Sequence, residues 1–407
     1  MADYDPELES LVRELNASKS AAAAKASAPG AGAAAGPRAV APMPVAAPVS
    51  AKPKVVSSLE QLLEYGKNRG ASDVLLVAGS GLILRVDGAL VQNKNPVFSE
   101  EEIRALALPL LTPQRADELE RERFADFSFV HPGIGRFRTN VHYQKGTLAV
   151  AIRILPAEIP TLESLHLPAA LARLTQRKQG LVLVTGPTGS GKTSTLAALL
   201  NLVNRQSAYH VVTIEDPIEY HHPNQRSVFE QIEIGHDANS FAASLRSVLR
   251  QSPDVILVGE MRDPDTMAAV LTAAETGHLV FSTLHTNDAV QAVNRIVDSF
   301  PAARQNQIRQ QLSLALAAIV AQQLVPAADG NGRYPAVEVL IANDAVRHII
   351  RKGEDHLLRS QLSIGRTDGM MLMEQSLAEL VQRGRIGREM AAAHCFRSDD
   401  LDRYLET

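Results

Sequence analysis

The sequence predicts an α/β fold, with a smaller α+β domain before the core and a helical part after it. Three observations support this. A short apolar run, Leu181–Thr185, leads through a glycine-rich turn into a helix-forming segment. Strand-like and helix-like segments then alternate to about residue 288, and several strands are apolar throughout, which is typical of a parallel sheet covered on both faces. Short β-rich segments divided by Gly and Pro come before the turn.

Length and composition narrow the class of protein. A chain of 407 residues has room for two or three domains, and 45% hydrophobic with 21% charged residues is typical of soluble globular proteins. Its single cysteine, Cys395, excludes an intrachain disulfide and a CxxC zinc site. The acidic start is no secretory signal, and no apolar run reaches the ~20 residues that span a bilayer. We therefore expect a soluble, cytoplasmic protein.

The first 56 residues are predicted to lie outside any packed core. Apolar residues at helical spacing predict a short amphipathic helix over residues 1–16, either a docking element or a free tail: Leu8, Leu11, Val12 and Leu15. Residues 17–56 are rich in Ala, Pro, Gly and Ser, which predicts a disordered linker.

Residues 57–155 predict the small α+β domain. A helix begins at the capping residue Ser58 and stops at Gly70, and one helical stretch is expected over residues 99–122. Strands are expected in the segments SDVLLVA, LILRVDGALVQ, FADFSFV, GRFRTNVHYQKG and TLAVAIRIL. The proline-containing segment that follows, up to residue 176, predicts a hinge or inter-domain connector.

Residues 156–407 predict a RecA-like core with C-terminal helices. Strands at YHVVTIED, DVILVGE and HLVFSTLH follow the glycine-rich turn, with helices between them over residues 239–250 and 264–277. From about Asp288 onward the pattern is mainly helical, apart from one expected strand at AVEVLIA.

The glycine-rich turn has the spacing GxxxxGK[ST] of a P-loop, which binds nucleotide phosphates. Glycines let backbone N–H groups close around phosphate oxygens, Lys192 supplies charge to the β- and γ-phosphates, and the Thr193 hydroxyl can ligate Mg²⁺. The strand before the turn and the helix after it argue against a chance match. The expected ATP-binding residues are Gly186, Pro187, Thr188, Gly189, Ser190, Gly191, Lys192, Thr193 and Ser194.

Hydrolysis of ATP also needs a carboxylate near Mg²⁺, a group that orients or deprotonates water, and positive charge against the γ-phosphate. Glu260 ends an apolar strand and would emerge at the carboxyl edge of the sheet, beside the P-loop. Glu219 lies in a second acidic segment, Glu215-Asp216-Pro-Ile-Glu219. Among these acids, one or two are expected to be only solvated or capping.

Histidines and arginines are further candidates. His278 and His285 bracket one strand at an odd offset, so they cannot both ligate one ion. His285 is better placed as a γ-phosphate sensor, whereas His278 is as readily structural. Other cations either reach phosphate or a partner's acid, or are ordinary surface charges. These are Arg136 and Arg138 on one strand face, Arg153, and Arg246 with Arg250 on one helix face.

Four ordered motifs resemble those of the hexameric secretion and type IV pilus ATPases, most closely the twitching-motility retraction ATPases. GPTGSGKTST is similar to their Walker A motif, TIEDPIEY to their Asp box, DVILVGEMRD to their Walker B motif with Glu260 for the usual Asp, and GHLVFSTLHTNDA to their His box. GASDV, RVDG and GRFR resemble their N-terminal domain, and EQSLAEL their C-terminal helices. The resemblance covers about residues 57 to 394.

The resemblance implies a homohexamer in which ATP and Mg²⁺ bind between a PAS-like N-terminal domain and a RecA-like domain of another or the same subunit. Glu219 would be the catalytic carboxylate, with Glu260 near the metal and water. The histidines would couple nucleotide state to the interface, and N-terminal arginines would act as fingers. The implied catalytic residues are Glu219, Glu260, Lys192, His285, His278, Arg138 and Arg153, and the implied Mg²⁺ residues are Thr193 and Glu260.

The resemblance also implies a partner, the pilus platform protein of the inner membrane, and hence a peripheral location at the pilus base. Retraction is favoured because assembly and type II secretion ATPases usually carry a tetracysteine zinc insertion. Ala345-Val-Arg-His-Ile-Ile350 resembles a retraction signature, although His348 stands where the family has Asn. The sequence departs from the family in two further ways: Leu75 stands in place of a His, and the chain has an N-terminal extension. These departures leave open that the protein is an accessory or regulatory paralogue. Such a paralogue would work beside the main motor or share a ring with it.

A nucleic-acid translocase on the same core is disfavoured, and we expect no nucleic-acid partner. The formal net charge is −4 and aromatic residues make up 4% of the chain. Single-strand binding usually relies on a basic groove and on aromatic stacking platforms.

Deletion of residues 1–54 is expected to leave ATP turnover nearly unchanged, because a linker adds no packed core. Steady-state turnover and thermal unfolding of the truncated and full-length proteins check this. A truncated protein that does not fold would show that the linker prediction is wrong.

Overall fold

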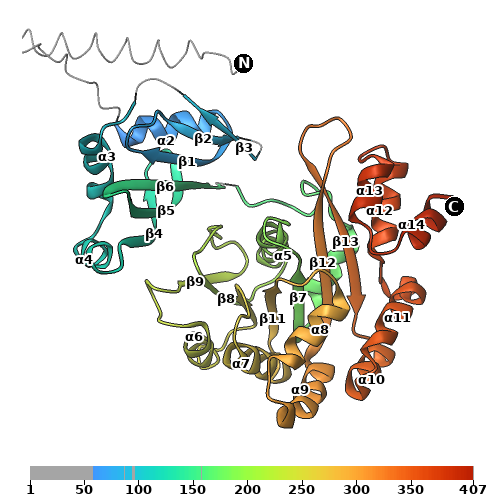
Figure 1. Ribbon diagram of the computed structural model, residues 1–407. Coiled ribbons are helices and arrows are strands. Elements are labelled where there is room, and N and C mark those ends of the chain that lie inside the picture. Colours follow the sequence, from blue (N-terminus) through green and yellow to red (C-terminus); the bar gives the residue numbers. More distant parts are fainter. Residues whose placement is uncertain (1–57, 87, 94–96, 157, 407) are drawn as a thin grey trace, which may run out of the picture. The chain divides into compact units, whose positions relative to one another are not determined.

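The structure, a computed structural model, describes residues 58–86, 88–93, 97–156 and 158–406. The helix predicted over residues 1–16 and the linker predicted over residues 17–56 lie outside the described residues. The chain divides into two compact units, Met1–Ile154 and Leu155–Thr407 (Figure 1).

The N-terminal unit contains a six-stranded sheet in the order β3-β2-β1-β6-β5-β4. Its strands are β1 (Ala71–Val77), β2 (Ile83–Val86), β3 (Ala89–Gln92), β4 (Phe124–His131), β5 (Gly135–Gln144) and β6 (Thr147–Leu155). The first strand pairs antiparallel with the last, so the two ends of the unit are joined at the centre of the sheet. Helix α2 (Leu59–Asn68) begins with a capping box between Ser58 and Gln61.

The helical stretch predicted over residues 99–122 consists of two α-helices, because two prolines interrupt it. Helix α3 (Glu100–Ala107) gives way to a 3₁₀ turn, η1 (Leu108–Leu110), that contains Pro109. Helix α4 (Pro113–Glu122) then starts afresh with Thr112 as its N-cap. Proline lacks an N–H and clashes with the preceding turn, so it is tolerated in the first turn of a helix but not inside it.

The second unit is built on a seven-stranded sheet in the order β13-β12-β7-β11-β10-β8-β9. All neighbours from β12 to β9 are parallel, and β13 is antiparallel to β12. The strands are β7 (Gly180–Thr185), β8 (His210–Glu215), β9 (Val228–Glu233), β10 (Val255–Val258), β11 (Leu279–Leu284), β12 (Leu316–Pro326) and β13 (Arg333–Ile341). The fold class predicted from the sequence is confirmed.

Hydrophobic cores cover both faces of this sheet. Along β7, Leu181 and Leu183 belong to one core, which α6 (Phe241–Val248), α7 (Pro264–Glu275), α8 (Ala289–Asp298) and α9 (Ala302–Ala315) help to form. Val182 and Val184 belong to the other core, which contains α5 (Lys192–Gln206) and η2 (Ala169–Gln176). Alternate residues of a strand face opposite sides, so a strand that is apolar throughout is buried between two layers.

Two strands of this sheet were not predicted from the sequence. Strand β12 was expected to be helical, but its continuous apolar run has no periodicity that separates a buried strand from a buried helix. Strand β9 lies at the sheet edge, in a segment for which the sequence predicted no element. The predicted connector also contributes to the core, because Leu162, Leu171 and Leu174 are buried in the unit that contains α5.

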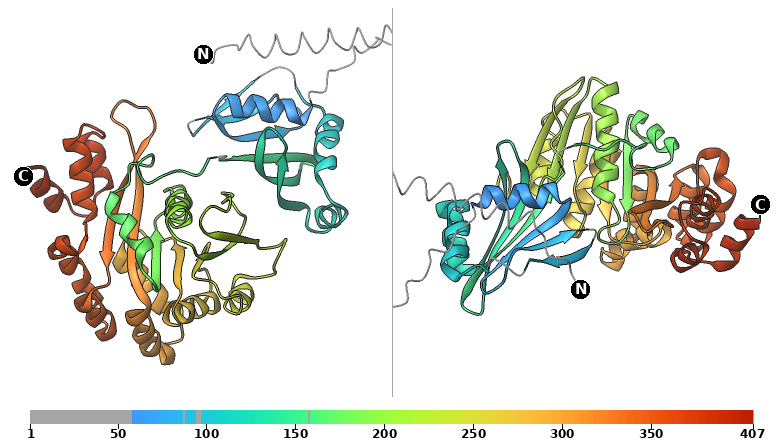
Figure 2. Two further views of the ribbon diagram at one scale, coloured as in Figure 1. Left: turned by 180° about the vertical axis from the view of Figure 1, so that it is seen from behind. Right: turned by 90° about the horizontal axis from the view of Figure 1, so that it is seen from above.

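The C-terminal helices lie beside β13 (Figure 2). They are α10 (Asp344–Lys352), α11 (Leu358–Ile364), α12 (Met373–Gln382), α13 (Arg388–His394) and α14 (Ser398–Glu406). One cation joins three of them, since Arg359 of α11 pairs with buried Glu374 of α12 at 3.0 Å and with Asp400 of α14 at 2.9 Å. No helix within the described ranges is long and apolar enough to cross a membrane.

Candidate nucleotide-binding site

The P-loop joins β7 to α5 through backbone conformations that favour glycine. Gly189 has a φ of 78° and Gly191, the N-cap of α5, has a φ of 86°. Side chains with a Cβ rarely adopt this left-handed region. The loop therefore places the N-terminus of α5, with its free N–H groups and positive dipole end, where an anion can bind.

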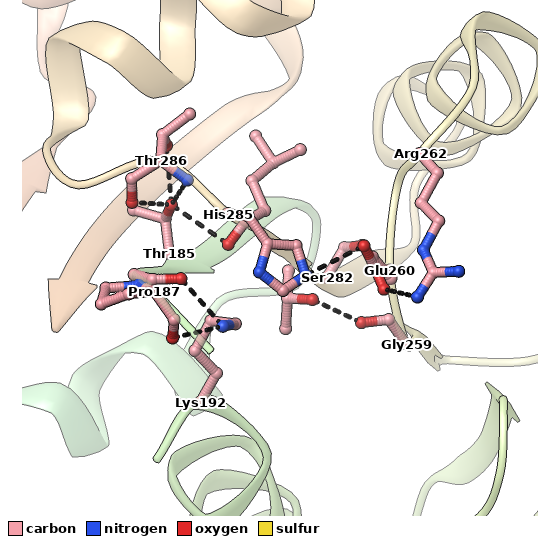
Figure 3. Close-up of polar contacts among 12 residues, drawn as sticks. Thr185, Pro187, Lys192, Gly259, Glu260, Arg262, Ser282, His285 and Thr286 are labelled. Carbon is pink, nitrogen blue, oxygen red and sulfur yellow. Dashed lines mark hydrogen bonds and ion pairs between the residues drawn. The ribbon is translucent and has the colours of Figure 1, made fainter. Parts of the chain in front are cut away.

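Lys192 points its amine back across the loop. Its Nζ donates to the backbone oxygens of Gly186 at 2.9 Å and Pro187 at 3.0 Å (Figure 3). Partial burial lowers the pKa of this amine, and the negative charges of Glu260 and Glu219 act in the opposite direction. The amine thus lies within the electrostatic influence of both acids predicted from the sequence.

Glu260 lies two residues beyond β10, and its carboxylate is held between a histidine ring and an arginine side chain. One oxygen lies 3.0 Å from His285 Nε2 and the other lies 2.8 Å from an Arg262 amine (Figure 3). Burial raises the pKa of Glu260, but the hydrogen bonds and charges of Arg262 and His285 outweigh burial and hold the pKa below its usual range. The carboxylate therefore stays ionised at neutral pH.

Hydroxyl groups fasten the loops that follow the three central strands to one another. Thr283 Oγ1 of β11 donates to the Gly259 oxygen after β10 at 2.6 Å. Thr185 Oγ1 of β7 accepts the N–H of Thr286, after β11, at 3.0 Å (Figure 3). These hydrogen bonds fix His285 and Glu260 relative to the start of the P-loop.

Glu219 lies in a loop after β8 that side chains of β9 hold in place. Gln231 donates to the Tyr220 oxygen and accepts the His222 N–H, both at 2.9 Å. The Tyr220 hydroxyl lies 2.9 Å from Ser194 Oγ, which ties the loop to the first turn of α5. Glu219 itself is half-buried, and its charge acts on Lys192.

Gln231 and Tyr220 were not identified by sequence reasoning. Gln231 was missed together with its strand, although turn residues on both sides of Val228–Glu233 are a signal of a short strand.

The other acids of this segment differ in environment. Asp216 is exposed, whereas Glu215 is buried and accepts hydrogen bonds from Thr213 at 2.7 Å and Gln231 at 3.2 Å. Burial raises the pKa of Glu215 to about 7, and these hydrogen bonds only partly oppose it. Glu215 is thus a structural carboxyl that titrates near neutrality.

The two histidines lie at opposite ends of β11. His285 contacts Glu260, whereas His278 precedes the strand and its Nδ1 lies 3.0 Å from the Ala273 oxygen. Seven residues of extended chain span about 20 Å, so His278 is far from Lys192 within this unit. A role for His278 at a subunit interface remains a prediction.

The predicted arginine fingers belong to the N-terminal unit. Arg153 donates to Asp73 at 3.0 Å, and Arg138 lies on β5 opposite Ser128 of β4. Their role as fingers remains a prediction. The expectation that Arg246 and Arg250 share a helix face is wrong, because α6 ends at Val248 and Arg250 lies beyond it.

The residues present fit a nucleotide with Mg²⁺. The loop offers backbone donors, a lysine amine and the buried Ser190 hydroxyl, which has no hydrogen-bond partner in the described part of the chain. No group of three or more metal-ligating His, Cys, Asp or Glu occurs among the residues that the structure describes.

The P-loop follows β7, His285 follows the neighbouring strand β11, and the ionised Glu260 follows β10, the strand next to β11. A P-loop, a histidine and an acid placed in this way on a parallel sheet define a P-loop ATPase. Residues 144–397 match the family described as "Type II/IV secretion system protein". The chain belongs to this family, as the motifs predicted.

Relatives and solved structures agree with this assignment. The chain is 42% identical over 347 residues to the "Twitching motility protein" of Neisseria gonorrhoeae, covering 85% of this chain and 93% of that one. It is 40% identical over 342 residues to the "Type IV pilus ATPase PilU" of Pseudomonas aeruginosa, covering 84% and 90%. The crystal structure of the pilus retraction motor PilT with bound ADP has a TM-score of 0.79 and 42% identity, covering 85% and 99%.

Lys192→Ala and Glu260→Ala are each expected to abolish Mg²⁺-dependent ATP turnover while leaving the protein folded. The first removes the charge expected to face phosphate, and the second removes the acid expected beside Mg²⁺. Turnover and thermal unfolding of purified variants check this, with Lys178→Ala and Glu354→Ala as exposed controls. A Glu260→Ala protein that hydrolyses ATP at the wild-type rate would contradict the assignment.

Glu215→Gln is expected to stabilise the protein more at pH 8 than at pH 5. Because the folded-state pKa is raised from 4.5 to about 7, the unfolded state loses this proton first, and stability falls as pH rises between those values. The loss of folding stability, on the order of 3 kcal/mol, is complete above about pH 7. Thermal unfolding at both pH values measures it, with exposed Glu354→Gln as control. An equal effect at both pH values would refute the prediction.

Proposed function

We propose that this protein is a homohexameric motor that hydrolyses ATP with Mg²⁺ to drive type IV pilus retraction. The observation that carries the proposal is the set of groups around Lys192, in which a phosphate-binding loop is combined with Glu260, His285 and the loop of Glu219. The names of the relatives supply the biological setting, because one is a twitching motility protein and another is a pilus retraction motor.

Each residue has a chemical task in this proposal. Lys192 and the N–H groups of the loop would bind the phosphates, and the Thr193 hydroxyl with Glu260 would hold Mg²⁺. The metal would stabilise charge that develops on the phosphates. Glu219 would orient or deprotonate the attacking water, since the oxygens of Glu260 already contact Arg262 and His285. His285 would pass a change at Glu260 to the loop that begins α8.

The proposed assembly is a ring that acts on a platform protein of the inner membrane, from its cytoplasmic side. Arg138 and Arg153 would supply positive charge to the γ-phosphate of a neighbouring or the same subunit. The segment that resembles a retraction signature forms α10, and exposed Ala345, His348 and Lys352 are available there for contact with a partner.

A second candidate function is an accessory or regulatory pilus ATPase that works beside another motor. The identity of 40% to PilU is close to the 42% shared with the twitching motility protein, so identity does not separate the two. The extension before residue 55 would then bind the main motor. The complete set of catalytic residue types favours a motor, and the single cysteine argues against a type II secretion or assembly ATPase.

The proposal is tested first on the purified protein. We expect ATP turnover that a chelator of Mg²⁺ abolishes, from a particle whose mass by light scattering is six times 43.9 kDa. Nucleotide binding without turnover would favour the regulatory function instead.

The second test is made in a pilus-bearing host that lacks its retraction ATPase. Expression of this chain is expected to restore twitching, whereas the Lys192→Ala variant should not. Restoration only together with a second pilus ATPase would support the accessory function.

A further inference from the structure

Gln322 is a buried amide behind the P-loop that joins two parts of the nucleotide site. It lies on β12, the strand next to β7, and is 2% exposed. Its Nε2 donates to the Ser190 oxygen at 2.7 Å, and its Oε1 accepts from Thr195 Oγ1 at 2.7 Å. The amide therefore connects the P-loop with the first turn of α5.

The two partners specify which way the amide points. A flipped amide would place Oε1 against the Ser190 oxygen, and two acceptors at that distance repel each other. The Thr195 hydroxyl can donate to Oε1 only in the observed orientation. Neither hydrogen bond is exposed to competing water, so both contribute more than surface hydrogen bonds do.

The first hydrogen bond fixes the direction of one P-loop peptide. In a planar trans peptide the oxygen and the following N–H point in opposite directions. Because Gln322 holds the Ser190 oxygen, the N–H of Gly191 points away from β12. Gly191 is the N-cap of α5, so this N–H stands at the end of the helix where an anion binds.

The same strand also limits the size of the P-loop residues. A Cβ on Gly191 would lie 2.9 Å from Gln322 Nε2, and one on Gly186 would collide with the Gln322 backbone oxygen. Both glycines are therefore packed against β12. Strand β12 therefore restricts the conformations that the P-loop can adopt.

We propose that Gln322 is a positioning residue that keeps the Ser190–Gly191 peptide in its phosphate-binding orientation. The inference rests on the proposed function, because it concerns nucleotide bound at this P-loop. Gln322 itself need not touch the nucleotide. Loss of the Gln322 amide lets the Ser190–Gly191 peptide rotate. Nucleotide binding therefore weakens more than the hydrolysis step slows.

The test compares three variants of the full-length protein. Gln322→Met keeps the volume but removes both hydrogen bonds, and Gln322→Glu places an oxygen against the Ser190 oxygen. Gln323→Met changes the next residue on β12, which is half-buried and hydrogen-bonds to His394 of α13 at 3.0 Å, away from the loop. We would measure the Kd of ADP with Mg²⁺ by calorimetry, kcat and KM for ATP, and Tm without nucleotide.

Both Gln322 variants are expected to raise the Kd of ADP and the KM for ATP at least about tenfold, from the loss of buried hydrogen bonds. Their kcat at saturating ATP should fall by less than threefold, and Gln323→Met should bind ADP like the wild type. A folded Gln322→Met protein that binds ADP within twofold of the wild type would overturn the inference. So would an equal loss in Gln323→Met, which would indicate a general effect on β12.

A milder variant covers the case in which Gln322→Met does not fold. Thr195→Val removes only the hydroxyl that orients the amide, and it is expected to raise the Kd of ADP severalfold. An unchanged Kd in Thr195→Val would then overturn the inference. A wild-type protein that binds no nucleotide would instead contradict the proposed function, so the two failures are distinguishable.

Discussion

The parallel pairing of the central strands is the constraint on which the site depends. Strands β7, β11 and β10 run side by side in one direction, so the residues that follow them emerge at the same edge of the sheet. The P-loop follows the first, His285 the second and Glu260 the third. Buried side chains on both faces of the sheet fix the register of these strands. The relative positions of the three groups are therefore set by the sheet and not by flexible segments.

Charge at this edge is balanced by residues from several elements. The Lys192 amine is partly buried and donates to the backbone oxygens of Gly186 and Pro187. The Glu260 carboxylate pairs with Arg262 at 2.8 Å and lies 3.0 Å from His285 Nε2. An incoming phosphate therefore meets a cation whose present partners are uncharged and displaceable, while the Glu260 carboxylate is already paired. This arrangement favours the binding of an anion over its repulsion.

The sequence was most informative where local chemistry decides the structure. Glycine spacing predicted the P-loop, and fully apolar runs predicted β7, β10 and β11. Patterns failed where tertiary context decides, because the apolar run of β12 suits a buried helix equally well. Gln322 could not be identified without that strand, nor Gln231 without β9. The predicted α/β order implies parallel strands, and hence the direction of β11. This direction explains why His285, at the end of the strand, contacts Glu260, whereas His278 lies at its start.

The most direct test of this account is a structure of the protein with Mg²⁺ and a non-hydrolysable ATP analogue. The account predicts that the Lys192 amine leaves the oxygens of Gly186 and Pro187 for a phosphate oxygen, and that Glu260 lies beside the metal. It also predicts that the Gly191 N–H points at a phosphate. A nucleotide bound elsewhere, or a Lys192 amine that keeps its backbone partners in the complex, would contradict it.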